Sequence, residues 1–419
     1  MTVAAPIKLT FENTKHVDSS HSLLPTGTSL MLLDENQKRV FNEFRLNKRA
    51  SKADVSLQVN LTHPAVTQIV RKLCELGYLK EDDEKRKGPR GQPATIYSIS
   101  DKNIFVGIHV GRSRFEFVAV ELTGNILKSV TIPVGFLQQE KLKCMSQKEL
   151  DGFLASKELA GRHIVGVGIS TPYFWEGWQS ILPLNNVIDQ SWSSDLVTSL
   201  FKLPSVDSLI VENDGSSAAL GELTFGTGAI HKDFLYVNIG TLIGGGLVID
   251  GTLRVGTHGN SAALAPFPVS ESRLSTAKKS AHPFEPLLRR ASLYSLKEHA
   301  DRKGIKLDLA KLDEITCTDT LSCLDEWVED CSSALAQFLI GVWSLIDIEA
   351  IVLDGGLPKS VLHKIIDSTL RHVQDFHTEG IITCDVKLGE LGSMAQSIGA
   401  ACLPMLSILG RPPTKNSEH

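Results

Sequence analysis

Residues 60–72, read as NLTHPAVTQIVRK, limit what this chain can fold into more than any other stretch. Thr62 is a good N-cap, and Pro64 falls in the first turn, where its missing N–H costs nothing. Apolar residues recur at three- and four-residue spacing and predict a helix with one packed face: Val66, Ile69, Val70, Leu73 and Leu76. The other face carries side-chain types that bond base edges and phosphates: Thr62, His63, Thr67, Gln68, Arg71 and Lys72. The pattern therefore predicts a helix that lies in a DNA major groove.

A second helix is expected just before this one. Ser51 followed by Asp54 matches a capping box, and the helix should bury Val55 and Val59. Asn60 tolerates the left-handed conformation that ends such a helix. Two short helices joined by so tight a turn predict a helix-turn-helix, with an earlier helix near residues 37–44 completing its core. We include Ser51 among the residues expected to contact DNA.

Residues 78–99 carry the pattern of a β-hairpin. Residues 78–80 begin a strand, and residues 94–99 alternate like its return partner. The tip between them, DDEKRKGPRGQP, is rich in Gly, Pro and cations. Such a run is usually only a solvated turn, but here it stands where a winged helix has its wing. We therefore predict a winged helix-turn-helix over residues 31–100, with wing contacts to DNA from Arg86, Lys87, Arg90 and Gln92.

The charge distribution indicates a basic module attached to an acidic body. The chain of 419 residues has a formal net charge of −5, which argues against a nucleic-acid coat protein. Residues 31–100 nevertheless contain 13 Lys and Arg against 9 Asp and Glu. Double-stranded operator DNA is therefore the expected partner of this module rather than of the whole surface.

Cysteine usage and hydropathy suggest a cytoplasmic protein. The seven cysteines are scattered and form no C-x-x-C pair, which is typical of reduced core thiols. Residues 1–30 lack an apolar signal core, and we expect them to form a flexible arm. No run is expected to approach membrane-spanning length, so no membrane partner is expected.

From residue 101 to residue 419 the chain reads as an α/β body. Three strands are expected near residues 105–111, 115–121 and 126–134, then a helix at 142–160 and a buried strand at 164–169. The layout then repeats: a strand at 234–239 runs into a Gly-rich turn and a hairpin, and a long helix at 327–346 precedes a strand at 350–356. A duplicated layout is what a two-lobed domain with a cleft requires.

Five segments in this order resemble motifs of the ROK family. They are GIHVGRS (107–113), VENDGSSAALGE (211–222), NIGTLIGGGLVIDG (238–251), HGNSAALAPFPV (258–269) and the pair LDGGL (353–357) and SMAQSIGAA (393–401). Each glycine motif alone would be weak, but the combination is strong. The resemblance spans residues 33–409 and implies a two-lobed actin/hexokinase-like, or ribonuclease-H-like, fold. This family groups sugar-responsive repressors with sugar kinases.

The two segments that resemble phosphate loops depart from the family pattern. His109 stands where the kinases have an Asp that organises metal and phosphate, and an imidazole cannot replace a carboxylate as partner of a hard cation. Leu242 stands where they have Gly, and its side chain is expected to obstruct the approach of a phosphate to the backbone. We regard these loops as degenerate, including Gly111, Ser113, Gly240, Thr241 and Gly244.

The signature segment departs further. Ala263 replaces the Glu that bonds a sugar hydroxyl in relatives, and Pro266 replaces the His that binds sugar or zinc. The cysteine cluster that normally follows is absent, so neither a structural zinc nor any other metal or cofactor is expected. Asp214 survives at the position of the catalytic base, but it also has simpler interpretations: a ligand contact, or a cap for a helix that starts near Ser216.

The resemblance implies a carbohydrate site between the lobes. The expected ligand-binding residues are Asn186, Asn213, Asp214, Gly259 and Asn260. An aromatic cluster at 173–178 suits either the apolar face of a pyranose or packing against the neighbouring lobe, and the sequence leaves both open.

The expected function is that of a transcriptional regulator, in which a winged helix binds an operator and the degenerate kinase body senses a sugar or sugar derivative. The expected assembly is a homodimer or homotetramer. Two alternatives stay open: an ATP-dependent sugar kinase with an accessory DNA module, and a DNA-binding dimer that needs no ligand.

Overall fold

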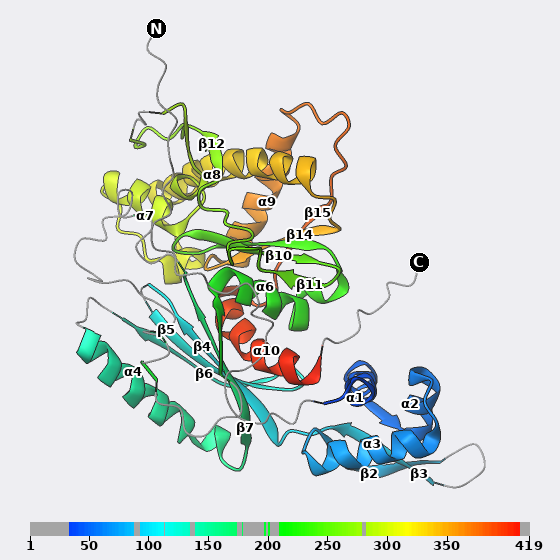
Figure 1. The fold of residues 1–419 in the computed structure, drawn as a ribbon. Coiled ribbons are helices and arrows are strands. Elements are labelled where there is room, and N and C mark those ends of the chain that lie inside the picture. Colours follow the sequence, from blue (N-terminus) through cyan, green and yellow to red (C-terminus); the bar gives the residue numbers. More distant parts are fainter. Residues whose placement is uncertain are drawn as a thin grey trace.

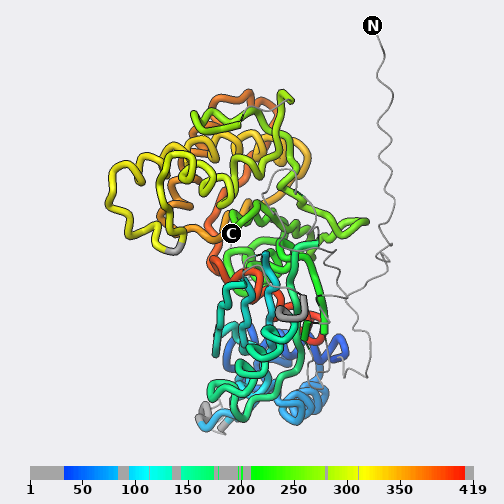
Figure 2. Tube along the Cα trace, turned by 90° about the vertical axis from the view of Figure 1, so that its left-hand side faces the viewer, coloured from blue at the N-terminus to red at the C-terminus, as the bar shows by residue number. Residues whose placement is uncertain are grey.

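The computed structural model describes residues 33–87, 93–112, 114–134, 139–173, 178, 197, 200–201, 209–278 and 282–410. These residues form a small N-terminal module and a body of two lobes. The module lies beside the first lobe, away from the second (Figure 1, Figure 2). The expected arm, residues 1–30, lies outside the described residues.

The module combines a helical core with a small sheet of strand order β1-β3-β2. Its elements are α1 (Glu35–Asn47), β1 (Arg49–Ser51), α2 (Lys52–Val59), α3 (His63–Glu75), β2 (Leu79–Lys87) and β3 (Pro93–Ile99). The predicted helix-turn-helix and wing are therefore present. Strand β1 was not predicted, because its residues carry no pattern of their own and pair with residues 96–98 of β3.

Local signals explain how the module's helices begin and end. Asp34 and Ser51 each accept a hydrogen bond from the backbone three residues on, and each forms a complete capping box, with Gln37 and Asp54 respectively. Asn60 ends α2 in the left-handed region at φ 51°, as predicted. The turn into α3 is thus determined by the sequence itself.

The first lobe is a five-stranded sheet of order β6-β5-β4-β7-β8, in which β6, β5 and β4 are antiparallel and β7 and β8 are parallel to β4. Its elements are β4 (Asn103–Val110), β5 (Arg114–Glu121), β6 (Ile126–Pro133), α4 (Gln139–Leu154), β7 (His163–Thr171) and β8 (Leu209–Asn213). Helix α4 ends at Leu154 rather than near residue 160, because a short 3-10 turn (Lys157–Leu159) follows it.

The second lobe repeats this order as β11-β10-β9-β14-β15. Its elements are β9 (Phe234–Ile239), β10 (Ile243–Ile249), β11 (Thr252–Arg254), α7 (Leu293–Arg302), α8 (Thr318–Leu345), β14 (Ala350–Gly355), α9 (Lys359–Val373) and β15 (Asp385–Leu388), with a small pair β12 (Pro268–Ser270) and β13 (Phe284–Pro286). The predicted duplication is therefore confirmed. The long helix begins at Thr318, earlier than predicted.

Two helices, α6 (Asp214–Phe225) and α10 (Ala395–Leu409), lie between the sheets (Figure 1). Both are buried along nearly their whole length. Glycines allow the close approach: a Cβ at Gly399 would lie 1.7 Å from the backbone oxygen of Ser217 on α6, and one at Gly168 would lie 1.8 Å from that of Ala400. The two helices thus form one rigid centre of the molecule.

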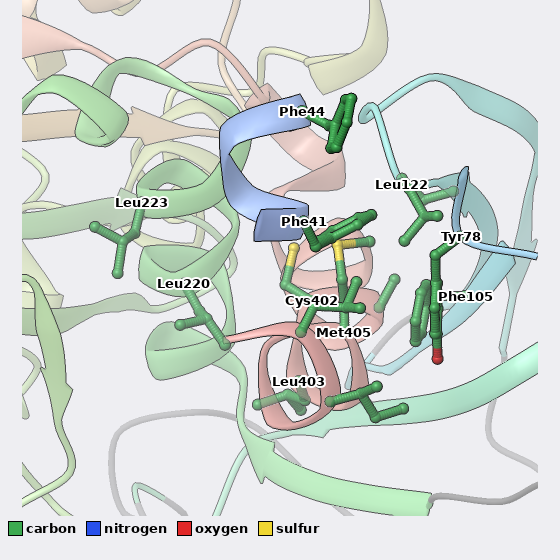
Figure 3. Packing of buried hydrophobic residues seen from close by; sticks show 14 of the residues in the cluster. Phe41, Phe44, Tyr78, Phe105, Leu122, Leu220, Leu223, Cys402, Leu403 and Met405 are labelled. Carbon is green, nitrogen blue, oxygen red and sulfur yellow. The ribbon is translucent and has the colours of Figure 1, made fainter. Parts of the chain in front are cut away.

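The module shares its hydrophobic core with this centre. Val40, Phe41 and Phe44 of α1 belong to the same buried cluster as Cys402 and Met405 of α10. Figure 3 shows Phe41 beside Cys402 and Met405, with Leu220 and Leu223 of α6 nearby. The connection from β3 to β4 consists only of residues 100–102, so module and body are joined both by packing and by a short linker.

Two expectations need correction. The stretch Gly392–Leu409 is long and apolar enough to span a membrane by length and composition, although no run was expected to be. In the fold, 72% of it is buried, because α10 is the central helix just described. All seven cysteines are free, but Cys144 and Cys317 are exposed and so are not core thiols.

Candidate functional site

The exposed face of α3 is the candidate DNA-binding surface. Val66, Val70 and Leu73 are buried, so the helix packs as its periodicity predicted. Four expected DNA-contacting residues are exposed, and two, Thr67 and Lys72, are half-buried; the exposed four are Thr62, His63, Gln68 and Arg71. Thr62 occupies the N-cap position, but its hydroxyl makes no capping bond.

Arg71 and Ser51 differ in how available they are to DNA. Arg71 Nε lies 3.6 Å from Glu75 Oε1, and both side chains are largely exposed, so this weak pair can be exchanged for a phosphate. Ser51 is only 6% exposed, and its hydroxyl serves the capping box with Asp54. The burial of Ser51 argues against its inclusion among the DNA contacts, because its hydroxyl is used to begin α2.

The wing is anchored to the module by Asp82 of β2. One of its carboxylate oxygens lies 2.7 Å from Arg49 Nε, and the other accepts a hydrogen bond from Ser98 Oγ at 2.7 Å. These contacts lower the pKa of Asp82, the hydrogen bond from Ser98 contributing most. Arg90 and Gln92 lie outside the described residues, as do the side chains of Arg86 and Lys87.

A second polar site surrounds the start of α6. Asn213 is the N-cap, its side chain accepting hydrogen bonds from the backbone N–H of Gly215 and Ser216. This corrects the expected start near Ser216, and it gives the capping role to Asn213 instead of Asp214. Asp214 is the first residue of the helix and accepts from Gly215 N–H at 2.9 Å.

Tyr173 connects this site to the signature segment. Its hydroxyl donates to Glu212 Oε1 at 2.7 Å, and its ring lies 3.3 Å from where a Cβ on Gly259 would be. Gly259 has φ 65°, so a side chain there would be strained as well as crowded. Tyr173, Glu212 and Gly259 come from three separate segments, and sequence reasoning missed Glu212 and left Tyr173 open.

Burial dominates the electrostatics at the start of α6. It raises the pKa of Asp214 and of Glu212, and it raises the pKa of Tyr173 as well. Arg112, in the turn after β4, is close enough that its charge lowers the pKa of Asp214 and opposes the effect of burial. Sequence reasoning did not single out Arg112, although it lies inside the first phosphate-loop motif.

His109 is a buried structural residue. Its Nδ1 lies 3.0 Å from Ser170 Oγ, and a Cβ on Gly111 would lie 2.6 Å from its Nε2. Burial lowers the pKa of His109 to about 3, so the ring is neutral at neutral pH. The first loop therefore has neither a carboxylate nor a cation at this position. Ser113 lies outside the described residues.

The glycines of the second loop allow close packing, Gly245 against β9 and Gly246 against α6. A Cβ on Gly245 would lie 2.5 Å from the oxygen of Tyr236, and one on Gly246 would lie 2.5 Å from Cβ of Ala219. Gly244 faces open space, and Thr241 is exposed. A Cβ on Gly240 would lie 2.8 Å from the side chain of Asn238.

Leu242 lies in the turn that resembles the second phosphate loop. Its side chain is half-buried and packs against the hydrophobic core of the second lobe. The expected obstruction of a phosphate by Leu242 is therefore not visible in its packing and stays a prediction.

The signature segment is distorted where it departs from the family. Ala262, next to Ala263, adopts φ 54°, a conformation that side chains disfavour. Asn260 and Ala263 are exposed. Of the expected ligand-binding residues, Asn213, Asp214 and Gly259 are described around the start of α6 and beside Tyr173, and Asn186 lies outside the described residues.

The segment where relatives have a cysteine cluster is held by an ion pair. Arg290 Nη2 lies 2.9 Å from Asp330 Oδ1, and both side chains are almost completely buried. Asp330 also accepts from Ser272 Oγ and from the backbone N–H of Arg273. Within the described ranges, no group of three or more His, Cys, Asp or Glu is arranged to hold a metal. These residues do not fit a zinc ion, and hydrogen bonds connect α8 to this loop instead.

A buried pair of acids lies farther along α6. Glu222 is completely buried, and its oxygens accept from the backbone N–H of Thr227, Glu390 and Leu391. Asp354 at the end of β14 is 1% exposed, accepts from Gly392 N–H and is hydrogen-bonded to Glu222. Burial raises the pKa of both acids, that of Glu222 to about 7. The pair connects α6 with the second sheet and with the loop before α10.

Comparison with known proteins identifies the family. Residues 105–405 match the ROK family, and residues 33–80 match the winged helix-turn-helix DNA-binding family. The chain belongs to the ROK family and carries an N-terminal winged helix-turn-helix.

Its relatives include both repressors and kinases. The chain is 22% identical over 344 residues to the xylose repressor of Caldicellulosiruptor bescii, covering 77% of this chain and 82% of the relative. It is 29% identical over 161 residues to a glucokinase of Streptomyces coelicolor, covering 38% and 47%. A related protein of Sinorhizobium fredii, 25% identical over 378 residues and covering 89% and 91%, is described as uncharacterised.

Solved structures share the fold. A ROK family transcriptional regulator described as a homologue of the E. coli Mlc protein has a TM-score of 0.64 at 18% identity, covering 90% of this chain and 96% of that one. A ROK family glucokinase from Streptomyces griseus in complex with glucose and AMPPNP has a TM-score of 0.53 at 21% identity, covering 72% and 98%. The match to the regulator covers enough of this chain to include the module. The match to the glucokinase covers a share of the chain close to that of the body alone.

Proposed function

We propose that this protein is a sequence-specific transcriptional regulator, in the role of a repressor of carbohydrate genes, and that a sugar in the cleft controls its binding to operator DNA. The winged helix-turn-helix carries this proposal. Its helix α3 exposes Gln68 and Arg71 to solvent, and the hydrophobic core of the module is continuous with that of the ROK body. The xylose repressors among its relatives support the same reading. The proposed setting is cytoplasmic, and the proposed assembly is a homodimer or homotetramer.

The site at the start of α6 supports a carbohydrate as the effector. Asn213, Asp214 and Glu212 place amide and carboxylate groups at one position, and these groups suit the donors and acceptors of sugar hydroxyls. The ring of Tyr173 beside Gly259 suits the apolar face of a pyranose. Tyr173 packs beside Gly259 of the second lobe, as the docking interpretation expects, and its ring is exposed enough, at 38%, to contact a ligand as well.

The composition of the site argues against a sugar kinase. Phosphoryl transfer depends on positioned metal ions and phosphates, and the neutral, buried His109 offers no ligand to a hard cation. We therefore propose that the protein has no kinase activity, although its family includes kinases.

The first test concerns DNA. An operator is selected from random duplexes with the full-length protein, and binding is measured at physiological salt for Arg71→Ala/Lys72→Ala. We expect operator binding to be lost, by more than about a hundredfold in Kd, with an unchanged thermal midpoint, since neither side chain is in the core. The matched control is Lys297→Ala/Lys364→Ala, which removes two exposed cations from the body. Equal binding by both double variants would contradict the assignment of α3.

The second test separates the three functions. Thermal stabilisation and coupled ATP turnover are measured across a panel of sugars that includes D-xylose and D-glucose. A repressor should be stabilised by at least one sugar and should show no turnover. Turnover that disappears in Asp214→Asn would establish the kinase alternative, and stabilisation by none of the sugars would favour the ligand-independent dimer.

A further inference from the structure

Helix α6 runs from the proposed sugar site to the DNA-binding module. Its first turn contains Asp214 and is capped by Asn213, and its last residue is Phe225. It has 12 residues and therefore spans about 18 Å. Residues 215–224 are all buried against the second sheet and α10, so a shift at the first turn is transmitted to the last rather than absorbed by bending.

The end of α6 lies close to the module at Arg45 of α1. The Arg45 guanidinium carbon lies 6.0 Å from the centre of the Phe225 ring. The ring also lies 2.7 Å from where a Cβ on Gly124 would be, so it packs directly on the turn between β5 and β6. Cys402 of α10 is near enough to influence the charge of Arg45. Arg45 thus reaches from the module toward both central helices.

Arg45 is half-buried at this contact and has one donor that no described residue satisfies. Burial lowers its pKa to about 10, and among the described residues its Nη1 is buried without a hydrogen-bond partner. A guanidinium normally uses its donors, and an orphaned charged donor is costly. A second arrangement of α1 against α6 that gives Nη1 a partner would relieve this cost. The contact is therefore suited to two alternative states rather than to one.

We propose that Arg45 is the positioning residue through which the sugar site sets the orientation of the DNA-binding module, by way of α6 and Phe225. The proposal rests on the proposed function, because it requires a sugar that alters operator binding. A ligand shifts such an equilibrium only by its differential affinity for the two states. A sugar that repositions the first turn of α6 binds the two states with different affinity, because the shift of the helix moves Phe225 against Arg45.

The test is Arg45→Met, which keeps an unbranched apolar stem and removes the charge. Operator Kd is measured without sugar and with saturating D-xylose or D-glucose, whichever gives the larger thermal shift in the unaltered protein. We expect both the sugar-free operator Kd and the sugar affinity to stay within about threefold of the unaltered protein. The ratio of the operator Kd with sugar to the operator Kd without sugar should become close to one. Arg45→Lys, which keeps a cation over the ring, should retain part of the ratio.

Two further variants make the result specific. Phe225→Leu removes the ring from the α6 side and should abolish the ratio as well, and combining it with Arg45→Met should add nothing. Arg254→Met makes the same replacement at a half-exposed arginine of β11 and should leave the ratio unchanged.

The outcomes distinguish this proposal from the proposed function. An unchanged ratio in both Arg45→Met and Phe225→Leu, with a sugar that works on the unaltered protein, overturns the role of Arg45 alone. Loss of sugar-free operator binding or of folding in both variants shows a purely structural role and also overturns it. If neither sugar changes the operator Kd of the unaltered protein, sugar control by these probes fails, and the coupling proposal fails with it.

Discussion

At the scale of single residues, the paired acids Glu222 and Asp354 illustrate how burial determines charge. Three backbone N–H groups donate to Glu222, which favours its ionised form. Two ionised carboxylates at hydrogen-bond distance in a buried site repel each other strongly, so the pair holds one proton between Glu222 and Asp354. The two groups titrate as a pair.

This pair predicts a fall in stability with rising pH. Because the pKa of Glu222 in this pair is raised from 4.5 to about 7, the folded state holds more protons than the unfolded state in that window. The contribution of this pair to the free energy of unfolding should therefore fall by about 2 to 3 kcal/mol as pH rises from about 4.5 to 7, and is fully present only below this range. Urea unfolding between pH 4.5 and 8 measures it.

Asp354→Asn is the informative variant for this prediction. The Asn amide can donate to Glu222 as the protonated acid does, so the pH dependence should flatten while stability at pH 7 is kept. Glu222→Gln is the matched comparison: it sets an amide against backbone donors and should destabilise at every pH. A slope that is the same in the unaltered protein and in Asp354→Asn would contradict the shared proton.

At the scale of elements, the contact of α6 with α10 should be the least tolerant of added volume. In Gly399→Ala the new Cβ would lie 1.7 Å from the backbone oxygen of Ser217, so the two helices must separate. We expect a loss of at least about 3 kcal/mol in the free energy of unfolding, measured by urea titration. Gly152→Ala in α4 is the control: nothing lies within 4 Å of its Cβ, and it should be neutral or stabilising by up to about 1 kcal/mol. Equal effects at the two glycines would contradict this packing.

How far the elements could be predicted depended on whether their signals were local. The capping boxes, the turn at Asn60 and the alternating apolar strands act within a few residues, so the module and the duplicated body followed from the sequence. Strand β1 did not, because it exists only through pairing with β3.

The site was less predictable for the same reason. The contact between Tyr173 and Glu212 joins residues 39 apart, and the proximity of Arg112 to Asp214 crosses between motifs. Residue spacing in a single sequence does not reveal which distant residues are in contact. The role of Ser51 was ambiguous in the sequence, because side chains that cap a helix and side chains that contact DNA are of the same chemical type.

At the scale of the whole molecule, we expect a homodimer on a two-fold symmetric operator. One helix-turn-helix contacts one half-site of an operator. A symmetric dimer contacts two half-sites, which increases the specificity of the protein for its operator. Light scattering on the eluting protein should give twice 45.7 kDa, or four times if dimers pair. Footprinting should show two half-sites related by inversion. A monomer that protects a single half-site would contradict this assembly.

The short connection between module and body sets a limit on reach. Residues 100–102 span at most about 10 Å when extended, whereas successive major grooves on one face of DNA are about 34 Å apart. Asn103 also donates to the backbone oxygen of Leu76, which fastens the end of this connection to the module. A module tethered in this way can turn against the body but cannot swing far enough to reach half-sites at a different separation. The separation it accepts is therefore set by the geometry of the bodies, and an operator with one added base pair between its half-sites should be rejected even though every base contact is still available.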